Sequence, residues 1–115
     1  MSTPEDHLPL HPLEFEILLT LNQGIAHTYA VVQAIEARQP EWNRIQPTNM
    51  YRRIWRLEAA DLLETVEAPA DETDPRRKYF AITPLGQLVA AAEASRLRSL
   101  LQVAFEAGVT AEEAP

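Results

Sequence analysis

The sequence predicts a mainly α-helical domain that contains one small β-hairpin and ends in a long helix. Three observations support this class. Apolar residues recur every three or four positions in the first half of the chain, as they do on the buried face of a helix. Two short stretches with β-branched and aromatic residues follow, separated by a polar loop that contains proline. The last third is rich in alanine and leucine, which favour helix.

Two helices are expected near the start, after a flexible N-terminal arm at residues 1–11 that contains two prolines and two histidines. Pro12 suits the first position of a helix over residues 12–22, because the N–H that proline lacks would have no partner there. Thr28 is expected to cap a second helix, since a hydroxyl can accept a hydrogen bond from the first turn. That helix should end before Pro40.

The third expected helix, residues 47–60, has a packing side and an arginine-bearing side. Its apolar residues are Met50, Ile54 and Leu57. Four polar side chains fall within one arc of roughly 100° and lie about 120° from the apolar side; they are Asn49, Arg52, Arg53 and Arg56. One side of this helix is therefore suited to packing and the other to carrying arginine.

Two short strands and a long helix complete the chain. The strands are expected at residues 62–68 and 77–82, with a polar loop between them. Thr83 and Pro84 form a strong start signal for the last helix, residues 84–107, and an acidic tail follows at 108–115. Three helices followed by a β-hairpin is the winged helix-turn-helix arrangement, which would occupy residues 12–83.

In a helix-turn-helix protein the second helix of the pair enters the major groove of double-stranded DNA. Arginine matches guanine or phosphate, and asparagine matches adenine. A basic cluster on the returning arm of the wing would contact the DNA backbone without reading sequence. The residues expected to contact DNA are Thr48, Asn49, Arg52, Arg53, Arg56, Arg76, Arg77 and Lys78.

The net charge of −7 neither supports nor excludes a DNA partner. Eight of the ten basic residues lie between Arg38 and Lys78, and charge attraction is screened over about 8–10 Å, so an acidic protein can present a basic face. Against this stand three acidic residues at the expected wing tip, Asp71, Glu72 and Asp74. The alternative interpretation is a winged-helix protein-interaction module that does not bind DNA.

The last helix is expected to need a partner. Its second half carries a broad apolar surface that extends past the winged unit, made of Leu97, Leu100, Leu101, Ala104 and Phe105. A surface of that kind usually marks an interface. A two-fold homodimer would place two recognition helices about 34 Å apart, one turn of DNA. The alternative is that the helix folds back on its own domain.

No enzyme, cofactor or metal site is expected. The chain has no cysteine, its three histidines lack metal-ligand spacing, and no Ser/His/Asp constellation is apparent. Trp42 and Trp55 could line a pocket for a flat aromatic effector, or Trp55 could pack against the last helix. The side chain of Tyr51 could belong to the core or contact DNA. Without a secretory signal or a membrane-spanning apolar run, a cytoplasmic location is expected.

Four segments in the same order resemble the PadR-like family of winged-helix transcriptional regulators; they are FEILLTLNQGIAHTY (15–29), PTNMYRRIWRLEAADLL (47–63), RKYFAIT (77–83) and Gly86. The resemblance implies that Tyr51 and the helix around it contact DNA. The single C-terminal helix resembles the shorter branch of the family, in which that helix forms the dimer. Three positions depart from the pattern, because Thr28, Thr48 and Asp61 stand where family members have glycine.

Together these features predict a sequence-specific transcriptional regulator without enzymatic activity. We expect a repressor that binds a pseudo-palindromic operator as a homodimer. A small molecule bound in the cleft between the two protomers could release it from DNA.

Overall fold

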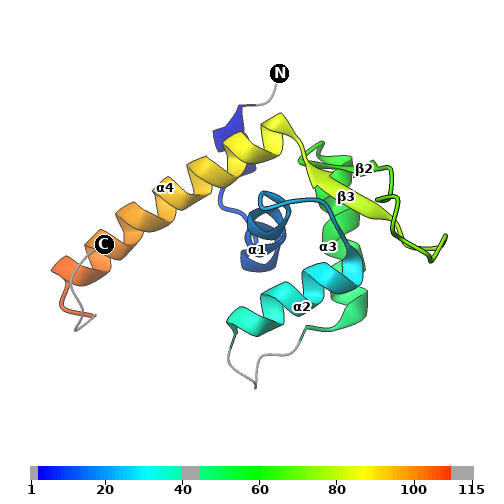
Figure 1. The fold of residues 1–115 in the computed structure, drawn as a ribbon. Coiled ribbons are helices and arrows are strands. Elements are labelled where there is room, and N and C mark those ends of the chain that lie inside the picture. The colour runs from blue at the N-terminus through cyan, green and yellow to red at the C-terminus, as the bar shows by residue number, and fades with distance from the viewer. Residues whose placement is uncertain (1–2, 40–44, 110–115) are drawn as a thin grey trace.

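The computed structural model describes residues 3–39 and 45–109, which form four α-helices and a three-stranded antiparallel sheet (Figure 1). The elements are the 3-10 helix η1 (Pro4–His7), α1 (Pro12–Leu21), β1 (Ala26–His27), α2 (Thr28–Arg38), α3 (Pro47–Ala59), β2 (Leu63–Val66), β3 (Tyr79–Ile82) and α4 (Pro84–Glu106). The mainly helical class with a small hairpin is confirmed.

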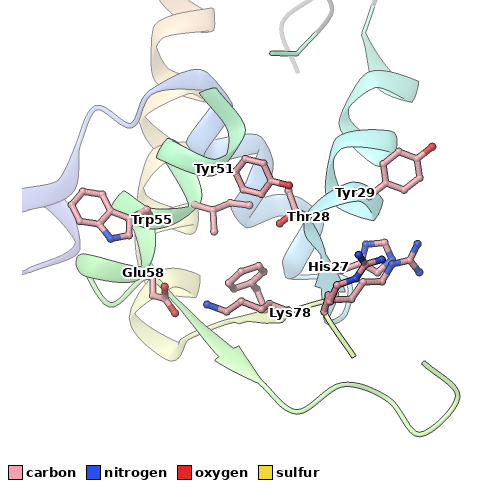
Figure 2. A pocket seen from close by; sticks show the side chains of 11 residues that line it. His27, Thr28, Tyr29, Tyr51, Trp55, Glu58 and Lys78 are labelled. Atoms are coloured by element: carbon pink, nitrogen blue, oxygen red, sulfur yellow. The ribbon is translucent and has the colours of Figure 1, made fainter. Parts of the chain in front are cut away.

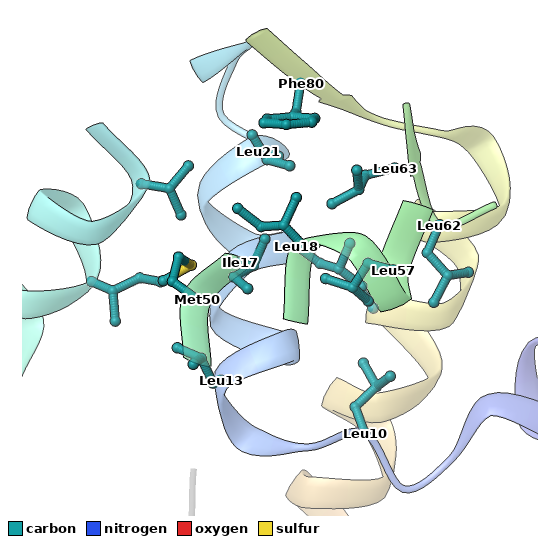
Figure 3. Close-up of a cluster of buried hydrophobic side chains, with 14 of the residues drawn as sticks. Leu10, Leu13, Ile17, Leu18, Leu21, Met50, Leu57, Leu62, Leu63 and Phe80 are labelled. Atoms are coloured by element: carbon teal, nitrogen blue, oxygen red, sulfur yellow. The ribbon is translucent and has the colours of Figure 1, made fainter. Parts of the chain in front are cut away.

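Helices α1, α2 and α3 pack around one apolar core, and the sheet and the start of α4 close it (Figures 1 and 3). The periodic apolar residues of α1 and α3 lie in its centre; Ile17, Leu18, Met50 and Leu57 are all essentially inaccessible to solvent. Because the core holds the apolar side of α3, the opposite side of that helix faces solvent.

The hairpin of β2 and β3 forms the wing, with residues 67–78 as the loop between the strands. Leu63 pairs with Ile82 at one end of the hairpin and Val66 with Tyr79 at the other. Strand β1 adds to the free edge of β3, with His27 opposite Tyr79. The sequence did not predict β1, because two residues are too few to show an alternating pattern.

The start of α2 differs from the expectation that Thr28 caps it. His27 is the cap: its Nδ1 accepts a hydrogen bond from the backbone N–H of Ala30 at 3.2 Å, and Thr28 is the first helical residue. His27 therefore joins β1 to α2 without an intervening loop.

The N-terminal segment is more ordered than the irregular arm expected for residues 1–11. Helix η1 lies against α4, and Leu10 is buried in the core (Figure 1). The Asp6 carboxylate accepts a hydrogen bond from the backbone N–H of Thr3 at 2.8 Å. Leu8 and Leu10 pack on the apolar core, which is why this segment is ordered.

Asp61 ends α3 in a left-handed conformation with φ of 63°. The backbone N–H of Leu62 bonds to the carbonyl of Leu57 at 2.9 Å, and that of Asp61 bonds to Glu58 at 3.0 Å. This pair of bonds is the Schellman motif, whose left-handed position usually holds glycine. The departure from the family pattern at Asp61 thus leaves the turn itself unchanged.

The turn after α3 also contacts the start of α4. The Thr83 hydroxyl donates to the carbonyl of Asp61 at 2.7 Å and accepts from the N–H of Gly86 at 2.9 Å. A side-chain carbon at Gly86 would lie 2.0 Å from the carbonyl oxygen of Leu62, so only glycine fits. Thr83 and Gly86 therefore set the angle at which α4 leaves the winged unit.

Candidate nucleic-acid interface

Arg52 and Arg56 are exposed on the outer side of α3, opposite the buried Met50, Ile54 and Leu57. Nη2 of Arg52 donates to Oδ1 of Asn49 at 2.9 Å, so these two side chains are held together on the surface. Thr48, in the first turn of α3, is exposed beside them. Free backbone N–H groups and the helix dipole favour an anion at this end of a helix.

Arg53 departs from this arrangement. Its side chain is only 14% exposed, and Nη1 lies 3.2 Å from Oε2 of Glu14, whose side chain is 10% exposed. The reason is the position of Arg53 on the helix. Arg53 follows Met50 by three residues, so its side chain lies about 60° around the helix axis from Met50, at the margin of the packing side. The expectation that Arg53 stands on the same exposed surface as Arg52 and Arg56 is therefore wrong.

Glu14 joins α1 to the polar edge of α3. The same carboxylate oxygen lies 3.9 Å from Nε of Arg56. Next to this pair, the Nδ1 of His11 accepts a hydrogen bond from the N–H of Leu13 at 3.1 Å and so caps α1. Burial, and then the Arg53 charge, lower the pKa of His11, which favours the neutral ring that this cap requires.

The acidic residues of the wing are paired within the wing itself. The side chain of Glu72 is 6% exposed; it accepts hydrogen bonds from the Tyr79 hydroxyl and from Nη1 of Arg77. Glu72 also accepts from the backbone N–H of Asp74 at 3.0 Å; the Tyr79 bond first, then the Asp74 and Arg77 bonds, lower the pKa of Glu72 to about 2. Asp74 accepts from the backbone N–H of Arg76 at 2.9 Å and pairs with its guanidinium at 3.2 Å. Two of the three expected repulsive charges are thus neutralised locally.

The basic side chains of the wing still face solvent. Arg76, Arg77 and Lys78 are exposed on the segment that leads into β3. Lys78 has no ion-pair partner in the part of the chain that the structure describes. These three cations line one hollow with Tyr51 and Trp55 of α3.

A row of rings connects α2 to the wing. The rings of His27 and Tyr29 are parallel with centroids 6.5 Å apart, and Tyr79 meets His27 edge-on at 5.3 Å. Tyr79 in turn donates to Glu72 of the wing loop. Sequence reasoning missed this row, although His27 and Tyr29 belong to one of the segments that resemble the family.

A hollow of about 340 Å³ lies between α3, the start of α2 and the wing (Figure 2). We call it the α3–wing hollow; its rim carries Tyr29, Tyr51, Trp55 and Lys78, and the buried Phe80 also lines it. Tyr51 is 62% exposed, so it does not belong to the core. Trp55 is 68% exposed on the hollow and does not pack against α4 of its own chain. Trp42 lies outside the described residues.

The second half of α4 extends beyond the winged unit, as the sequence predicted (Figure 1). In its first half Val89 and Ala90 are buried, and Glu93 is buried and paired with Arg96 at 2.6 Å. Farther along the helix the apolar side chains are uncovered; Leu97, Leu100, Leu101 and Phe105 are exposed and Ala104 is half-buried.

Within residues 3–39 and 45–109, no three His, Asp or Glu side chains converge as metal ligands. Among the same residues, no helix combines the length and the apolar character needed to cross a bilayer. The chemical features of the described residues are therefore the exposed basic side chains of α3 and of the wing.

The family model described as the transcriptional regulator PadR-like family matches residues 17–92, which include the second half of α1, all of α2 and α3, the sheet with its wing, and the start of α4. The chain belongs to this family. Members of the PadR-like family are DNA-binding transcriptional regulators and not enzymes. Among curated proteins, no sequence matches the chain.

Solved structures share the PadR-like fold at low sequence identity. A PadR family transcription regulator from Clostridium difficile is 18% identical with a TM-score of 0.74, covering 84% of this chain and 97% of that one. A transcriptional regulator from Clostridium thermocellum is 22% identical with a TM-score of 0.71, covering 82% and 87%. A PadR-like transcription factor from Bacteroides fragilis is 24% identical with a TM-score of 0.68, covering 82% and 87%.

Proposed function

We propose that this PadR-like regulator is a cytoplasmic repressor that binds a pseudo-palindromic operator as a homodimer and is released by a small molecule. One observation carries the proposal: α3 exposes Arg52 and Arg56 opposite its buried side, and Tyr51 and Trp55 of the same helix line one hollow with the basic residues of the wing. A helix in the major groove with a wing on the flanking backbone needs these two features together.

Within this surface the residues have different proposed roles. Arg52, oriented by Asn49, and Arg56 project from α3 toward base edges or phosphate. Thr48 and the backbone of the first turn are suited to a phosphate. Tyr51 would contact DNA beside them. The three cations of the wing would contact the DNA backbone; they are Arg76, Arg77 and Lys78. Arg53 would support the helix from below through Glu14.

The homodimer would form through the uncovered half of α4. The side of α4 that packs on its own domain at Val89 and Ala90 continues along the helix as Leu97, Leu101 and Ala104. The domain ends before the apolar surface does, and a second copy of the same surface could cover it.

The proposal is tested by fluorescence anisotropy with DNA from the protein's own promoter. Affinity should fall steeply as salt rises, since phosphate contacts release counterions. We expect Arg52→Ala to weaken binding about tenfold or more, in line with roughly 1–3 kcal/mol for a good arginine contact. Arg98→Ala removes the same charge from exposed α4 and serves as the control, with a change of less than about twofold expected.

Two results would contradict the proposal. Equal affinity of wild type and the Arg52→Ala, Arg56→Ala double variant would exclude α3 as the reading helix. Folded, dimeric protein that binds no DNA even at low salt would favour the protein-interaction module instead.

A further inference from the structure

His11 stands at the start of α1, accessible to solvent and beside the first turn of α3. Its bond as the cap of α1 decides where its ring carries a proton. Nδ1 accepts the hydrogen bond from the backbone N–H of Leu13 at 3.1 Å. A neutral imidazole has one proton, which must then lie on the other ring nitrogen. Nε2 of His11 is therefore an N–H donor that the cap does not use.

An open hollow separates His11 from the start of α3, and every side chain that lines it can donate a hydrogen bond. None of these side chains is acidic, and none of them lines the α3–wing hollow. We call it the donor hollow; it is lined by His11, Gln46, Thr48, Asn49, Arg52 and Arg53. A surface made of donors favours a ligand made of acceptors, such as the oxygen atoms of a phosphate.

Positive charge dominates around His11. Partial desolvation is the first cause that lowers its pKa, and nearby charges contribute as well. Among those charges the cations outnumber the anion; they are Arg53, Arg52 and Arg56 against Glu14. Glu14 is already engaged with Arg53 at 3.2 Å. His11 thus contributes a neutral donor to a cationic surface, and such a surface attracts an anion.

We propose that His11 is a further DNA contact of the winged unit, and that its Nε2–H donates to a backbone phosphate at the start of α3. This inference deepens the DNA-binding function proposed above and rests on it. The phosphate would occupy the donor hollow beside Thr48 and Arg52. The contact would add affinity without reading sequence, because a phosphate carries no base information. Helix α1 would then touch DNA together with α3 and the wing.

The competing account is that His11 only caps α1, and asparagine separates the two roles. Asparagine is a preferred cap, but its side chain is too short to reach where Nε2 lies. His11→Asn should keep the melting temperature within about 2 °C of wild type. In fluorescence anisotropy with promoter DNA it should weaken binding about three- to tenfold, as expected for one lost hydrogen bond.

His11→Ala removes the cap together with the donor. It should weaken DNA binding as much as His11→Asn does, and it should also lower the melting temperature by about 3–8 °C. Gln23→Ala is the matched control, because it removes a neutral, exposed side chain just past the other end of α1. We expect it to change the affinity for DNA by less than about twofold.

A neutral donor also predicts a particular salt dependence. Loss of a charged phosphate contact reduces the slope of log K against log salt by about one, whereas loss of a neutral contact leaves the slope unchanged. We therefore expect His11→Asn to lower the affinity equally at every salt concentration. A slope reduced by about one in this variant would overturn the neutral donor.

Two further measurements locate the contact. A long-range ¹⁵N–¹H correlation spectrum of the His11 ring, assigned with His11→Asn, should show the proton on Nε2 and a slower exchange of that proton when DNA is bound. Single phosphates of a footprinted half-site are then replaced by methylphosphonate. One replacement should weaken wild type but weaken His11→Asn by less than about twofold further, because the two changes remove the same bond. A proton on Nδ1 in the free protein would overturn the proposal.

The outcomes distinguish this contact from the DNA-binding function itself. If Arg52→Ala weakens binding while His11→Asn binds DNA as tightly as wild type, His11 only caps α1 and this inference alone is overturned. Wild-type protein that binds no promoter DNA at low salt would overturn the proposed function, and the His11 contact with it.

Discussion

Arg53 and Asp61 show that the role of a residue depends on where its side chain can reach. Arg53 lies at the margin of the apolar side of α3, and a carboxylate on α1 turns it inward. Asp61 adopts the left-handed conformation that its family pattern assigns to glycine. Aspartate tolerates that region better than most residues, so the turn is kept.

The Arg53–Glu14 pair leads to a stability prediction. Arg53→Ala should lower the free energy of unfolding by about 1–3 kcal/mol, because it leaves the Glu14 carboxylate partly buried without its closest cation. Urea denaturation measures the change. The double variant Glu14→Gln, Arg53→Met should recover part of it, since no unpaired charge remains. A loss of DNA affinity as large as that of Arg52→Ala, without a loss of stability, would contradict the supporting role.

Gly86 is expected to be intolerant of any side chain. Gly86→Ala would place a carbon 2.0 Å from the carbonyl oxygen of Leu62, so the junction between α3 and α4 must shift. We expect a loss of about 2–4 kcal/mol, at or above the usual range for overpacking, with a lower melting temperature in calorimetry. Ser95→Ala, on the exposed side of α4, is the control and should be neutral or slightly stabilising. Unchanged stability of Gly86→Ala would contradict this close approach.

At the scale of elements, ion pairs within the wing and one row of aromatic rings stabilise the position of the wing. Glu72 links the loop to β3 through Tyr79, and the ring of Tyr79 contacts His27 at the start of α2. Binding elements made of short strands are mobile unless such contacts order them. The wing is therefore coupled to the helix-turn-helix unit through side chains as well as through β1.

The low pKa of Glu72 gives a prediction on pH. Its folded pKa of about 2 lies below the ordinary 4.5, so folding favours the ionised form. The resulting stabilisation is fully present above about pH 4.5 and is lost as the pH falls toward 2. Titration of the Glu72 carboxyl carbon by NMR should show the low midpoint. Tyr79→Phe removes the hydrogen bond that contributes most to the low pKa and should raise the titration midpoint of Glu72. An unchanged midpoint in that variant would contradict the role assigned to Tyr79.

At the scale of the whole molecule, α4 divides into a packed half and a free half. The apolar side of the helix runs past the end of the domain (Figure 1), and Leu100 is 54% exposed in the part of the chain that the structure describes. Under the proposed function, this division would separate a DNA-reading unit at one end of the protein from an assembly surface, the exposed apolar side of α4, at the other.

The assembly surface is tested by charge insertion. Leu100→Glu should convert the proposed dimer to monomer in analytical ultracentrifugation, because a carboxylate would be buried in an apolar interface. DNA affinity should then fall at least tenfold, since one half-site alone remains bound. Leu88→Glu is the matched control, because Leu88 is 57% exposed on the same helix and lies two and a half turns from Leu97, on the opposite side. Dimers that persist in Leu100→Glu would exclude this surface.

The sequence by itself determined the order of the helices and the hairpin, the packing side of α3 and the apolar stripe of α4. These features depend on periodicity, prolines and caps, which act between residues close in the chain. Only the tertiary structure decided that Arg53 turns to Glu14, that the wing acids pair within the loop, and that Tyr29, Tyr51 and Trp55 share one hollow with Lys78. These relations join residues far apart in sequence, and local pattern does not encode the distances between them.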